Sequence, residues 1–347
     1  MKFDRQVWIV GAANWFPATR DYASAAIQRG ELSVEHAELK GVDSVAVATD
    51  ISAPEMAVRA TSAALADSGL VGADIDFLFH SWLYHQGHDL WSVPHFIANA
   101  VGAVNCWPMS MHQGCDGGVL SLYNATLLLS KGTDPHTALV TASDRFVAPG
   151  VDRWNNSPTF ALGDAGSAVV LSNQASHPGY RLEIAAISAR TAPVFEVLNR
   201  GDTPFSDFPL GNGIPSQESA VGENVIESTG GMDFMVKTGQ SKIREVFDEA
   251  LAEAGITDVE QQLDLVMLPR IGASVLENSF MPILEEYPLL QVRSGHADSG
   301  HLGCGDLGAD LAEIMSTRAL AEGRHAALFG LGGWFTWTCT IVKGVTA

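Results

Sequence analysis

The stretch MHQGCDGG, residues 111–118, places one cysteine among three glycines. The residues that follow have apolar side chains at helical spacing, so Cys115 is expected at the N-terminus of a helix. Unpaired backbone N–H groups and the positive end of the helix dipole stabilise a thiolate there, which makes the cysteine a nucleophile. Cys115 is therefore a candidate for covalent catalysis. A small buried core cysteine is the common alternative.

A second set of reactive side chains lies in SGHLGCGD, residues 299–306, in the other half of the chain. His301 stands between glycines, and Asp306 follows five positions later. Beside an acylated cysteine, a histidine can act as general base toward a hydroxyl or amine. A carboxylate on its second ring nitrogen would complete a triad. Asp306 fits equally well as the N-cap of the helix expected over the segment LGADLAEIMSTRALAEG.

Two pairs of similar segments indicate how these residues are positioned. An amphipathic helix, a glycine turn and an apolar strand are expected in both 54–82 and 241–272, and a glycine-rich turn entering a strand in both 162–172 and 331–343. The pattern predicts an internally duplicated α/β unit in a layered α/β/α/β/α sandwich. We expect two domains, 1–175 with the cysteine and 176–347 with the histidine. An irregular connection is expected over about 190–235, which is rich in Gly, Pro, Ser and Asp.

Composition excludes several classes of function. The chain has 347 residues with 46% hydrophobic and 17% charged side chains, enough for a large core. A formal charge of -20 argues against binding to nucleic acid or an anionic membrane. No segment reads as a signal peptide or membrane span, so a cytoplasmic protein is expected. The four cysteines form no CxxC pair, and no dinucleotide fingerprint is present, so we expect neither a metal nor a nicotinamide cofactor.

The segments around the cysteine resemble a known family. SVPHFIANAVG before it, FALGDAGSAVVLS after it and GGWFTWT near the C-terminus are similar to the β-ketoacyl synthase III branch of the thiolase-like superfamily. The resemblance implies a thiolase-like five-layered α/β/α/β/α sandwich, a homodimer, and an acyl carrier protein or coenzyme A thioester as donor, with no cofactor. Cys115 matches the acylated cysteine, and Gly333 matches the glycine whose N–H joins that of Cys115 in the oxyanion hole.

The sequence departs from this family at two positions. LPRIGAS places Arg270 where condensing relatives have a histidine, and GHLGCGD places His301 where they have an asparagine. Arginine stays protonated and cannot shuttle a proton, so carbon–carbon bond formation is not expected. His301 would then be the general base, with His296 as its rival because a slip in the alignment exchanges the two. Arg270 would be a salt-bridge partner or would fill the vacated pocket.

A cysteine, histidine and aspartate without the condensing histidine resembles the acyltransferases of antibiotic and polyketide biosynthesis. The main hypothesis is therefore acyl transfer through Cys115 to a hydroxyl or amine of a small acceptor, such as a sugar or aminocyclitol, in secondary metabolism. A condensing synthase and a catalytically silent homologue that acts as a binding partner are the alternatives.

Several further residues are candidates for the substrate pocket. The run HSWLYHQGHDLW, residues 80–91, has histidines at no recognised zinc spacing, and we expect His85, His88 and Trp91 to line the substrate entrance. Met232 and Phe234 could form an apolar wall for an acyl chain, although such residues are more often core. The GDAG turn, 163–166, is expected to have a structural role.

Overall fold

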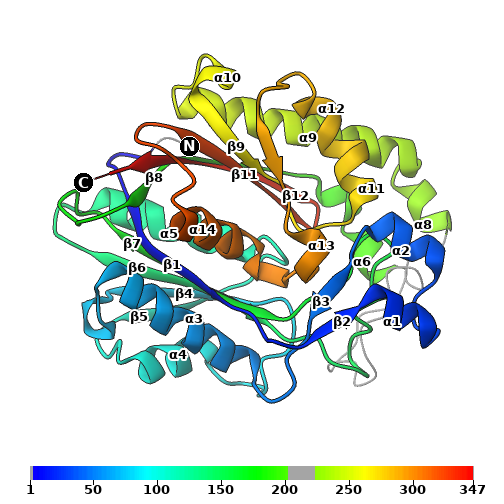
Figure 1. The fold of residues 1–347 in the computed structure, drawn as a ribbon, viewed down its shortest axis with the longest axis horizontal. Coiled ribbons are helices and arrows are strands. Elements are labelled where there is room, and N and C mark those ends of the chain that lie inside the picture. Colours follow the sequence, from blue (N-terminus) through cyan, green and yellow to red (C-terminus); the bar gives the residue numbers. More distant parts are fainter. Residues whose placement is uncertain (1–2, 202–222, 347) are drawn as a thin grey trace.

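The computed structural model describes residues 3–201 and 223–346. Figure 1 shows five layers, with α3 and α4 outside one sheet, α5 and α14 between the sheets, and α9 outside the other. The predicted five-layered α/β/α/β/α sandwich is thus confirmed. The bounds of these helices are α3 Ala53–Ser68, α4 Val93–Val101, α5 Gly117–Lys131, α14 Asp306–Thr317 and α9 Gly231–Glu253.

The two sheets repeat one strand order. The first sheet has the order β5-β4-β6-β7-β1 and the second has the order β10-β9-β11-β12-β8. Strands at the same place along each half of the chain therefore occupy the same place in their sheet. Parallel and antiparallel pairs also occur at the same places. This repetition confirms the predicted internal duplication. The strands are β1 Trp8–Trp15, β4 Phe77–Ser81, β5 Trp107–Met111, β6 Thr137–Asp144, β7 Ala165–Ser172, β8 Arg181–Thr191, β9 Leu263–Met267, β10 Gln291–Arg293, β11 His325–Gly332 and β12 Thr336–Val345.

The two sheets are joined by a short contact between β1 and β8. Only two residue pairs, Trp8 with Glu183 and Ile9 with Leu182, are in register there, and they link the ten strands into one hydrogen-bonded ladder. The expected division between residues 175 and 176 falls between β7 and β8. The division into two domains stays a prediction.

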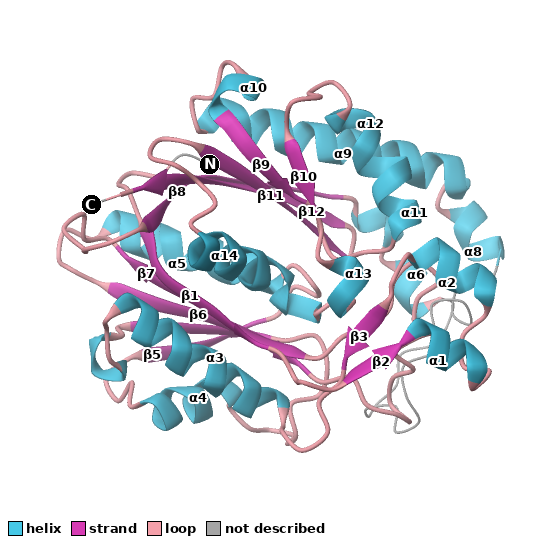
Figure 2. Cartoon of the chain, viewed as in Figure 1, coloured by secondary structure: helices cyan, strands magenta, loops and turns pink. Residues whose placement is uncertain are grey.

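Short elements decorate this framework (Figure 2). A two-stranded sheet and neighbouring helices lie beside one end of the sandwich, and several short helices follow the strands of the second half. They are β2 Arg20–Tyr22, α1 Ala23–Gln28, α2 Val34–Lys40, β3 Ser44–Ala46, η1 Gly72–Asp74, η2 Pro193–Phe195, α6 Val197–Arg200, α8 Glu223–Ser228, α10 Val259–Gln262, α11 Ala273–Val275, η3 Leu276–Phe280, α12 Met281–Leu284, α13 His296–Ser299 and η4 Gly303–Gly305.

Continuous apolar runs explain the buried strands. Every residue of β6 and of β7 is buried, as expected for strands covered by helices on both faces. The expectation of an irregular connection over about 190–235 is wrong for its described parts, since α6, α8 and the start of α9 are helical. Helices α6 and α8, of four and six residues, are too short to show the apolar periodicity that would have indicated them. Residues 202–222 of that segment lie outside the described residues.

The GDAG turn holds the second half against the first. Leu162 and His301 form a parallel bridge, the amide of His301 donates to Ala161 O at 2.8 Å, and the amide of Gly163 donates to His301 O at 2.8 Å. A Cβ on Gly163 would come within 1.9 Å of the carbonyl oxygen of Ser299. The turn therefore needs glycine because two backbones meet there.

We predict that Gly163→Ala destabilises the protein by about 1–3 kcal/mol, because the backbone of Ser299 must move. Urea unfolding measures the change. Gly132→Ala is the control, since φ at Gly132 is -75° and its Cβ would meet His136 Cδ2 at 3.5 Å and the carbonyl oxygen of Asp134 at 4.0 Å, both ordinary contact distances. Equal stability of the two variants would contradict the prediction.

Candidate active site

Cys115 lies in the turn between β5 and α5. Asp116 occupies the N-cap position and Gly117 is the first helical residue, so the cysteine lies one residue before the N-cap. Its side chain is half-buried. Gly114 has φ of +54°, and the indole ring of Trp334 lies 2.9 Å from where its Cβ would be. Trp334 thus covers the backbone next to the cysteine.

Glycines at the start of α5 make room for the segment that carries the histidine. A Cβ on Gly118 would lie 2.4 Å from the carbonyl oxygen of Cys304, and one on Gly117 would lie 3.0 Å from the sulfur of Cys304. These two glycines therefore admit another part of the chain. This close approach places η4 beside the turn that carries Cys115.

His301 and Asp306 form a buried pair. The Nδ1 atom of His301 lies 2.8 Å from Oδ2 of Asp306, and the histidine is 2% exposed. The other carboxylate oxygen of Asp306 accepts the amide of Leu302 at 2.9 Å, and Oδ2 also accepts the amide of Arg270 at 3.2 Å. The carboxylate therefore fixes the imidazole in one orientation, with Nε2 free to face elsewhere.

The free side of the imidazole faces Cys115. Burial alone would lower the pKa of His301, but Coulombic attraction to Asp306 and Cys115 and hydrogen bonds to both side chains outweigh it and raise the pKa well above its ordinary value. Since Nδ1 is engaged by Asp306, we assign the hydrogen bond with Cys115 to Nε2. The raised pKa favours the protonated imidazole at neutral pH.

Two alternatives from the sequence can now be compared with the geometry. The N-cap of α14 is Gly305, and Asp306 is the first helical residue, with its carboxylate turned back toward Leu302 and His301. His296 is half-buried in α13, where its Nδ1 lies 3.0 Å from Ser294 Oγ. The geometry thus favours His301 over His296 as the histidine paired with Asp306.

Two further buried carboxyl groups surround the histidine. Asp144 accepts the amides of Leu83, Tyr84 and Cys304, and Asp116 lies against the β11–β12 turn. Burial raises the pKa of each to about 7, partly opposed by backbone N–H groups and by attraction to His301. Each is therefore close to half-protonated at neutral pH, which limits the negative charge in the site.

Arg270 forms a buried ion pair with Asp310. Its guanidinium donates to Asp310 Oδ1 at 2.7 Å and to Ser299 Oγ at 3.0 Å, and both charged side chains are under a tenth exposed. Burial raises the pKa of Asp306, whereas attraction to His301 and, less strongly, to Arg270 lowers it. The net pKa of Asp306 lies below its ordinary value. Of the two roles considered from sequence, the salt-bridge partner fits these contacts.

The expected oxyanion glycine lies in the turn between β11 and β12. Gly333 directly follows Gly332, where a Cβ would come within 2.5 Å of Asp116 Oδ2, and directly precedes Trp334, which covers Gly114. Its carbonyl accepts the side-chain amide of Asn199 at 2.7 Å. The turn is therefore held against residues on both sides of Cys115, while the role of the Gly333 N–H stays a prediction.

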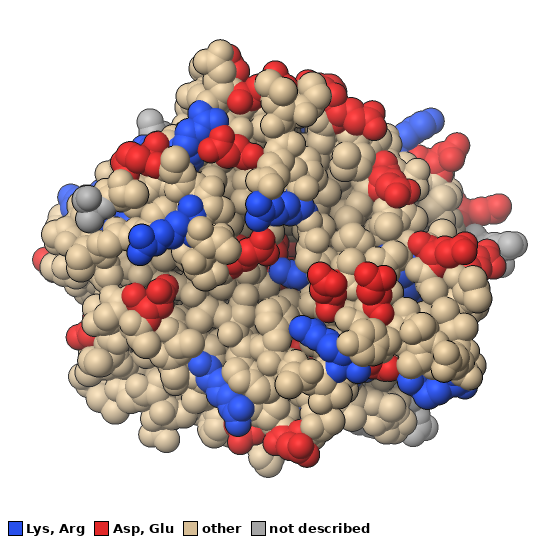
Figure 3. Space-filling view, viewed as in Figure 1, with Lys and Arg blue, Asp and Glu red and all other residues tan. Residues whose placement is uncertain are grey.

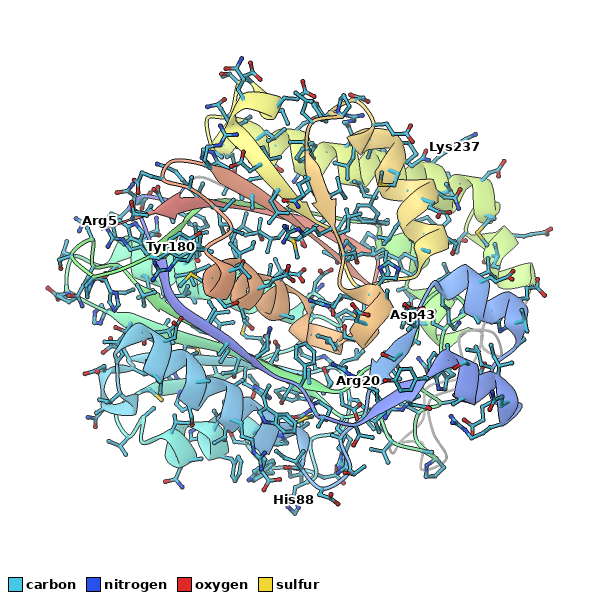
Figure 4. All side chains as sticks on the ribbon, viewed as in Figure 1. Arg5, Arg20, Asp43, His88, Tyr180 and Lys237 are labelled. Carbon is cyan, nitrogen blue, oxygen red and sulfur yellow. The ribbon has the colours of Figure 1, made fainter. Side chains whose placement is uncertain are left out.

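The remaining predicted pocket residues lie on exposed surfaces. His85 and His88 are exposed, and Figure 4 shows His88 at the edge of the molecule, pointing outward. Trp91 packs edge-on against His88 with centroids 5.4 Å apart. Met232 and Phe234 are about half exposed at the start of α9, where Phe234 contacts Phe195. Their roles in substrate binding stay predictions.

Other residues near the catalytic candidates were not found from sequence. Phe160 packs edge-on against the ring of His301, with centroids 5.0 Å apart. His112 lies 5.1 Å from the ring of Trp334 and 6.0 Å from that of Trp82. A cavity of about 630 Å³ between α5, β8 and β12 extends to Asp116. Aromatic residues are too common in cores for their positions to have marked them, but Asp116 beside the cysteine was a usable signal.

Sequence comparisons identify related enzymes. Residues 109–190 match the family model of 3-oxoacyl-[acyl-carrier-protein] synthase III. The β-ketoacyl-[acyl-carrier-protein] synthase III of Mycobacterium tuberculosis is 23% identical over 296 residues, which cover 85% of this chain and 82% of the relative. The synthase III of Clostridium perfringens is 21% identical over 313 residues, with 87% and 88% covered.

Structural comparisons agree with these relatives. The acyltransferase ChlB3 superposes with a TM-score of 0.87 and 28% sequence identity, covering 98% of each chain. The 3-oxoacyl-[acyl-carrier-protein] synthase III of Aquifex aeolicus superposes with a TM-score of 0.75 at 16% identity, covering 97% of this chain and 99% of its own. The chain therefore has the thiolase fold. Within that fold it is a ketoacyl synthase III-like protein, and its relatives support an enzyme of the acyl-transferring or condensing kind.

Two further structural features concern residues 3–201 and 223–346. No helix in this part of the chain is long and apolar enough to cross a membrane. Within the same ranges, no three His, Cys, Asp or Glu side chains are grouped so that they could hold a metal ion.

We predict that Asp306→Asn lowers the pH at which His301 titrates, because a negative charge that raises the pKa of the imidazole is removed. Side-chain NMR of the histidine ring measures the midpoint. Asp298→Asn is the control, since Asp298 acts on His296. An unchanged His301 midpoint in Asp306→Asn would show that the pair does not set the protonation of the imidazole.

We also predict that Arg270→Met destabilises the protein by about 3–5 kcal/mol, because Asp310 is left buried without its cation. The loss should grow as the pH rises above 7. Burial already raises the pKa of Asp310 to about 7, and the folded state would have to keep this carboxyl protonated. Denaturant unfolding at several pH values measures it.

The matched control is Arg293→Met, which breaks an exposed ion pair with Glu313 and should change stability by less than about 1 kcal/mol. The double variant Arg270→Met/Asp310→Leu should recover most of the lost stability, because no unpaired charge remains. Failure of the second substitution to help would argue against the ion pair as the cause.

Proposed function

We propose that this protein is an acyltransferase that moves an acyl group from a carrier-protein or coenzyme A thioester to Cys115, and then to a hydroxyl or amine of a small acceptor. The observation that carries the proposal is the series Asp306, His301, Cys115, with the histidine buried in the middle. It supplies a nucleophile and an oriented imidazole, while Arg270 is held in its pair with Asp310. A sugar or aminocyclitol in secondary metabolism is the acceptor we favour.

The first half-reaction acylates the cysteine. The sulfur of Cys115, paired with the imidazolium of His301, attacks the carbonyl carbon of the donor thioester. The backbone N–H groups of Cys115 and Gly333 would stabilise the negative oxygen of the tetrahedral intermediate. When this intermediate collapses, the carbon–sulfur bond of the donor breaks, and the departing thiolate takes the proton from His301. The products are acyl-Cys115, a free thiol and a neutral imidazole.

The second half-reaction uses the neutral imidazole. Acylation removes the negative charge of the sulfur, one of the interactions that raise the pKa of His301. The imidazole can therefore accept the proton of the acceptor hydroxyl or amine as that group attacks the acyl carbon. Asp306 stabilises the imidazolium that forms. Cleavage of the acyl–sulfur bond then restores the sulfur anion beside the imidazolium.

Space and surface charge are compatible with small substrates. The cavity of about 630 Å³ that extends to Asp116 lies in the size range of small-molecule sites. On the face seen in Figure 3, basic and acidic side chains are interspersed. An acidic carrier protein would therefore contact separate basic side chains on this face.

The proposal includes a homodimer. β5 ends its sheet, and Trp107 on this edge strand is 65% exposed, which leaves a strand edge open to pairing. Sedimentation equilibrium at the mass of one chain would contradict the dimer.

The acyl-enzyme can be tested directly. We predict that intact-mass measurement after mixing with a panel of acyl-coenzyme A and acyl-carrier-protein thioesters shows one acyl adduct that is absent in Cys115→Ala. Cys106→Ala, at another partly buried cysteine, is the control and should keep the adduct. His301→Ala should lose transfer to the acceptor by about 10²–10⁴-fold, and more than it loses acylation.

Two results would replace the proposal by the alternatives. Release of carbon dioxide from malonyl thioester with elongation of the acyl chain would indicate a condensing synthase. No adduct on the wild-type protein with any donor would indicate a catalytically silent homologue.

A further inference from the structure

Cys304 lies between His301 and Asp306 in the sequence, yet its side chain contacts the turn that carries Cys115. Its sulfur is fully buried and lies 3.0 Å from the carbonyl oxygen of Gly114, to which the thiol donates. The same sulfur accepts a hydrogen bond from the amide of Gly117. The sulfur therefore connects the carbonyl of Gly114 with the amide of Gly117, the two residues that flank Cys115 and Asp116.

The backbone of Cys304 is fixed independently. Its amide donates to Asp144 at 3.3 Å, and this carboxylate also accepts the amides of Leu83 and Tyr84. Ser81, at the end of β4, contributes a side-chain hydrogen bond to the sulfur. The thiol is thus held on a rigid support and in turn holds the nucleophile turn.

The fit leaves little freedom for another arrangement. The sulfur lies 3.0 Å from where a Cβ on Gly117 would be, so it occupies space that this glycine leaves open. Burial raises the pKa of the Cys304 thiol well above its ordinary value, and the nearby Asp144 and Cys115 raise it further. Cys304 therefore stays a neutral donor and does not compete as nucleophile.

We propose that Cys304 is a positioning residue: its thiol joins the Cys115 turn to the segment carrying His301 and sets the alignment of the cysteine with the imidazole. This inference rests on the proposed function for its catalytic meaning, but the alignment itself is a property of the resting protein. A displacement of about 1 Å between reacting groups can cost about a hundredfold in rate.

The test compares Cys304→Ala and Cys304→Ser with Cys339→Ala. Cys339 is the matched control, because it is also fully buried, lies in β12, and has a pKa raised by burial alone. Three quantities are measured: the rate of Cys115 alkylation by iodoacetamide, located by peptide mass; the pH midpoint of the His301 ring by NMR; and kcat and KM for an acyl-coenzyme A donor.

Cys304→Ala should slow alkylation of Cys115 and lower kcat, each by roughly tenfold to a hundredfold. The midpoint of His301 should move to lower pH, because the interaction with Cys115 that raises it is weakened. KM should stay within about twofold of wild type. Cys304→Ser, which keeps a donor, should recover part of the loss, while Cys339→Ala should lose stability without these effects.

The inference is overturned if Cys304→Ala alkylates and titrates like the wild type, or if Cys339→Ala shows the same losses. If Cys304→Ala does not fold, Cys304→Ser decides. A measurable loss of Cys115 alkylation in Cys304→Ser, with wild-type alkylation and titration in Cys339→Ala, supports the inference. No loss in Cys304→Ser overturns it. Alkylation and titration need no acyl donor. Absence of an acyl adduct together with the expected alkylation pattern would therefore reject the proposed function and leave the positioning role intact.

Discussion

The site depends on how closely two backbone segments from different halves of the chain can approach. Gly118 lets the start of α5 come so near to Cys304 that a Cβ would lie 2.4 Å from a carbonyl oxygen. Gly163 allows the same closeness to the segment before His301. A methyl group at either place would force the facing backbone to move. These contacts between glycine and backbone therefore set how closely the segments that carry Cys115 and His301 can approach each other.

Burial adds a second constraint, because carboxylates are costly to keep charged in a low-dielectric interior. Asp116 and Asp144, both near half-protonation at neutral pH, leave Asp306 as the carboxylate that is stabilised in its charged form. It has His301 and Arg270 nearby as cations. The negative charge is thus concentrated where it orients the imidazole.

Much of the fold could be predicted from sequence, because the duplication was visible in it. The pair 54–82 and 241–272 corresponds to α3 with β4 and to α9 with β9, and these strands hold equivalent places in the two sheets. Sequence did not predict helices α6 and α8, since four and six residues are too few to show helical periodicity.

For the site, residue type and motif indicated Cys115, His301 and Asp306, but contact partners depend on tertiary packing. Arg270 forms an ion pair with Asp310, which lies one turn after Asp306 on α14. No local sequence pattern predicts this pair. Cys304 belongs to no CxxC pair, and no sequence pattern marks its contact with the carbonyl of Gly114, which is distant in sequence. The exposed positions of His88, Met232 and Phe234 could not be derived from composition either.

The repeated strand order has a consequence for the origin of the reacting groups. α5 and α14 are the equivalent middle-layer helices of two copies of one unit, and Cys115 and His301 each lie a few residues before the start of its own helix. The two candidate groups therefore come from corresponding turns of the two copies but from different positions in them, because Cys115 lies two residues before α5 and His301 lies five residues before α14. The cysteine of the segment HQGC, residues 112–115, and the histidine of the segment HLGC, residues 301–304, thus stand at opposite ends of one shared four-residue pattern.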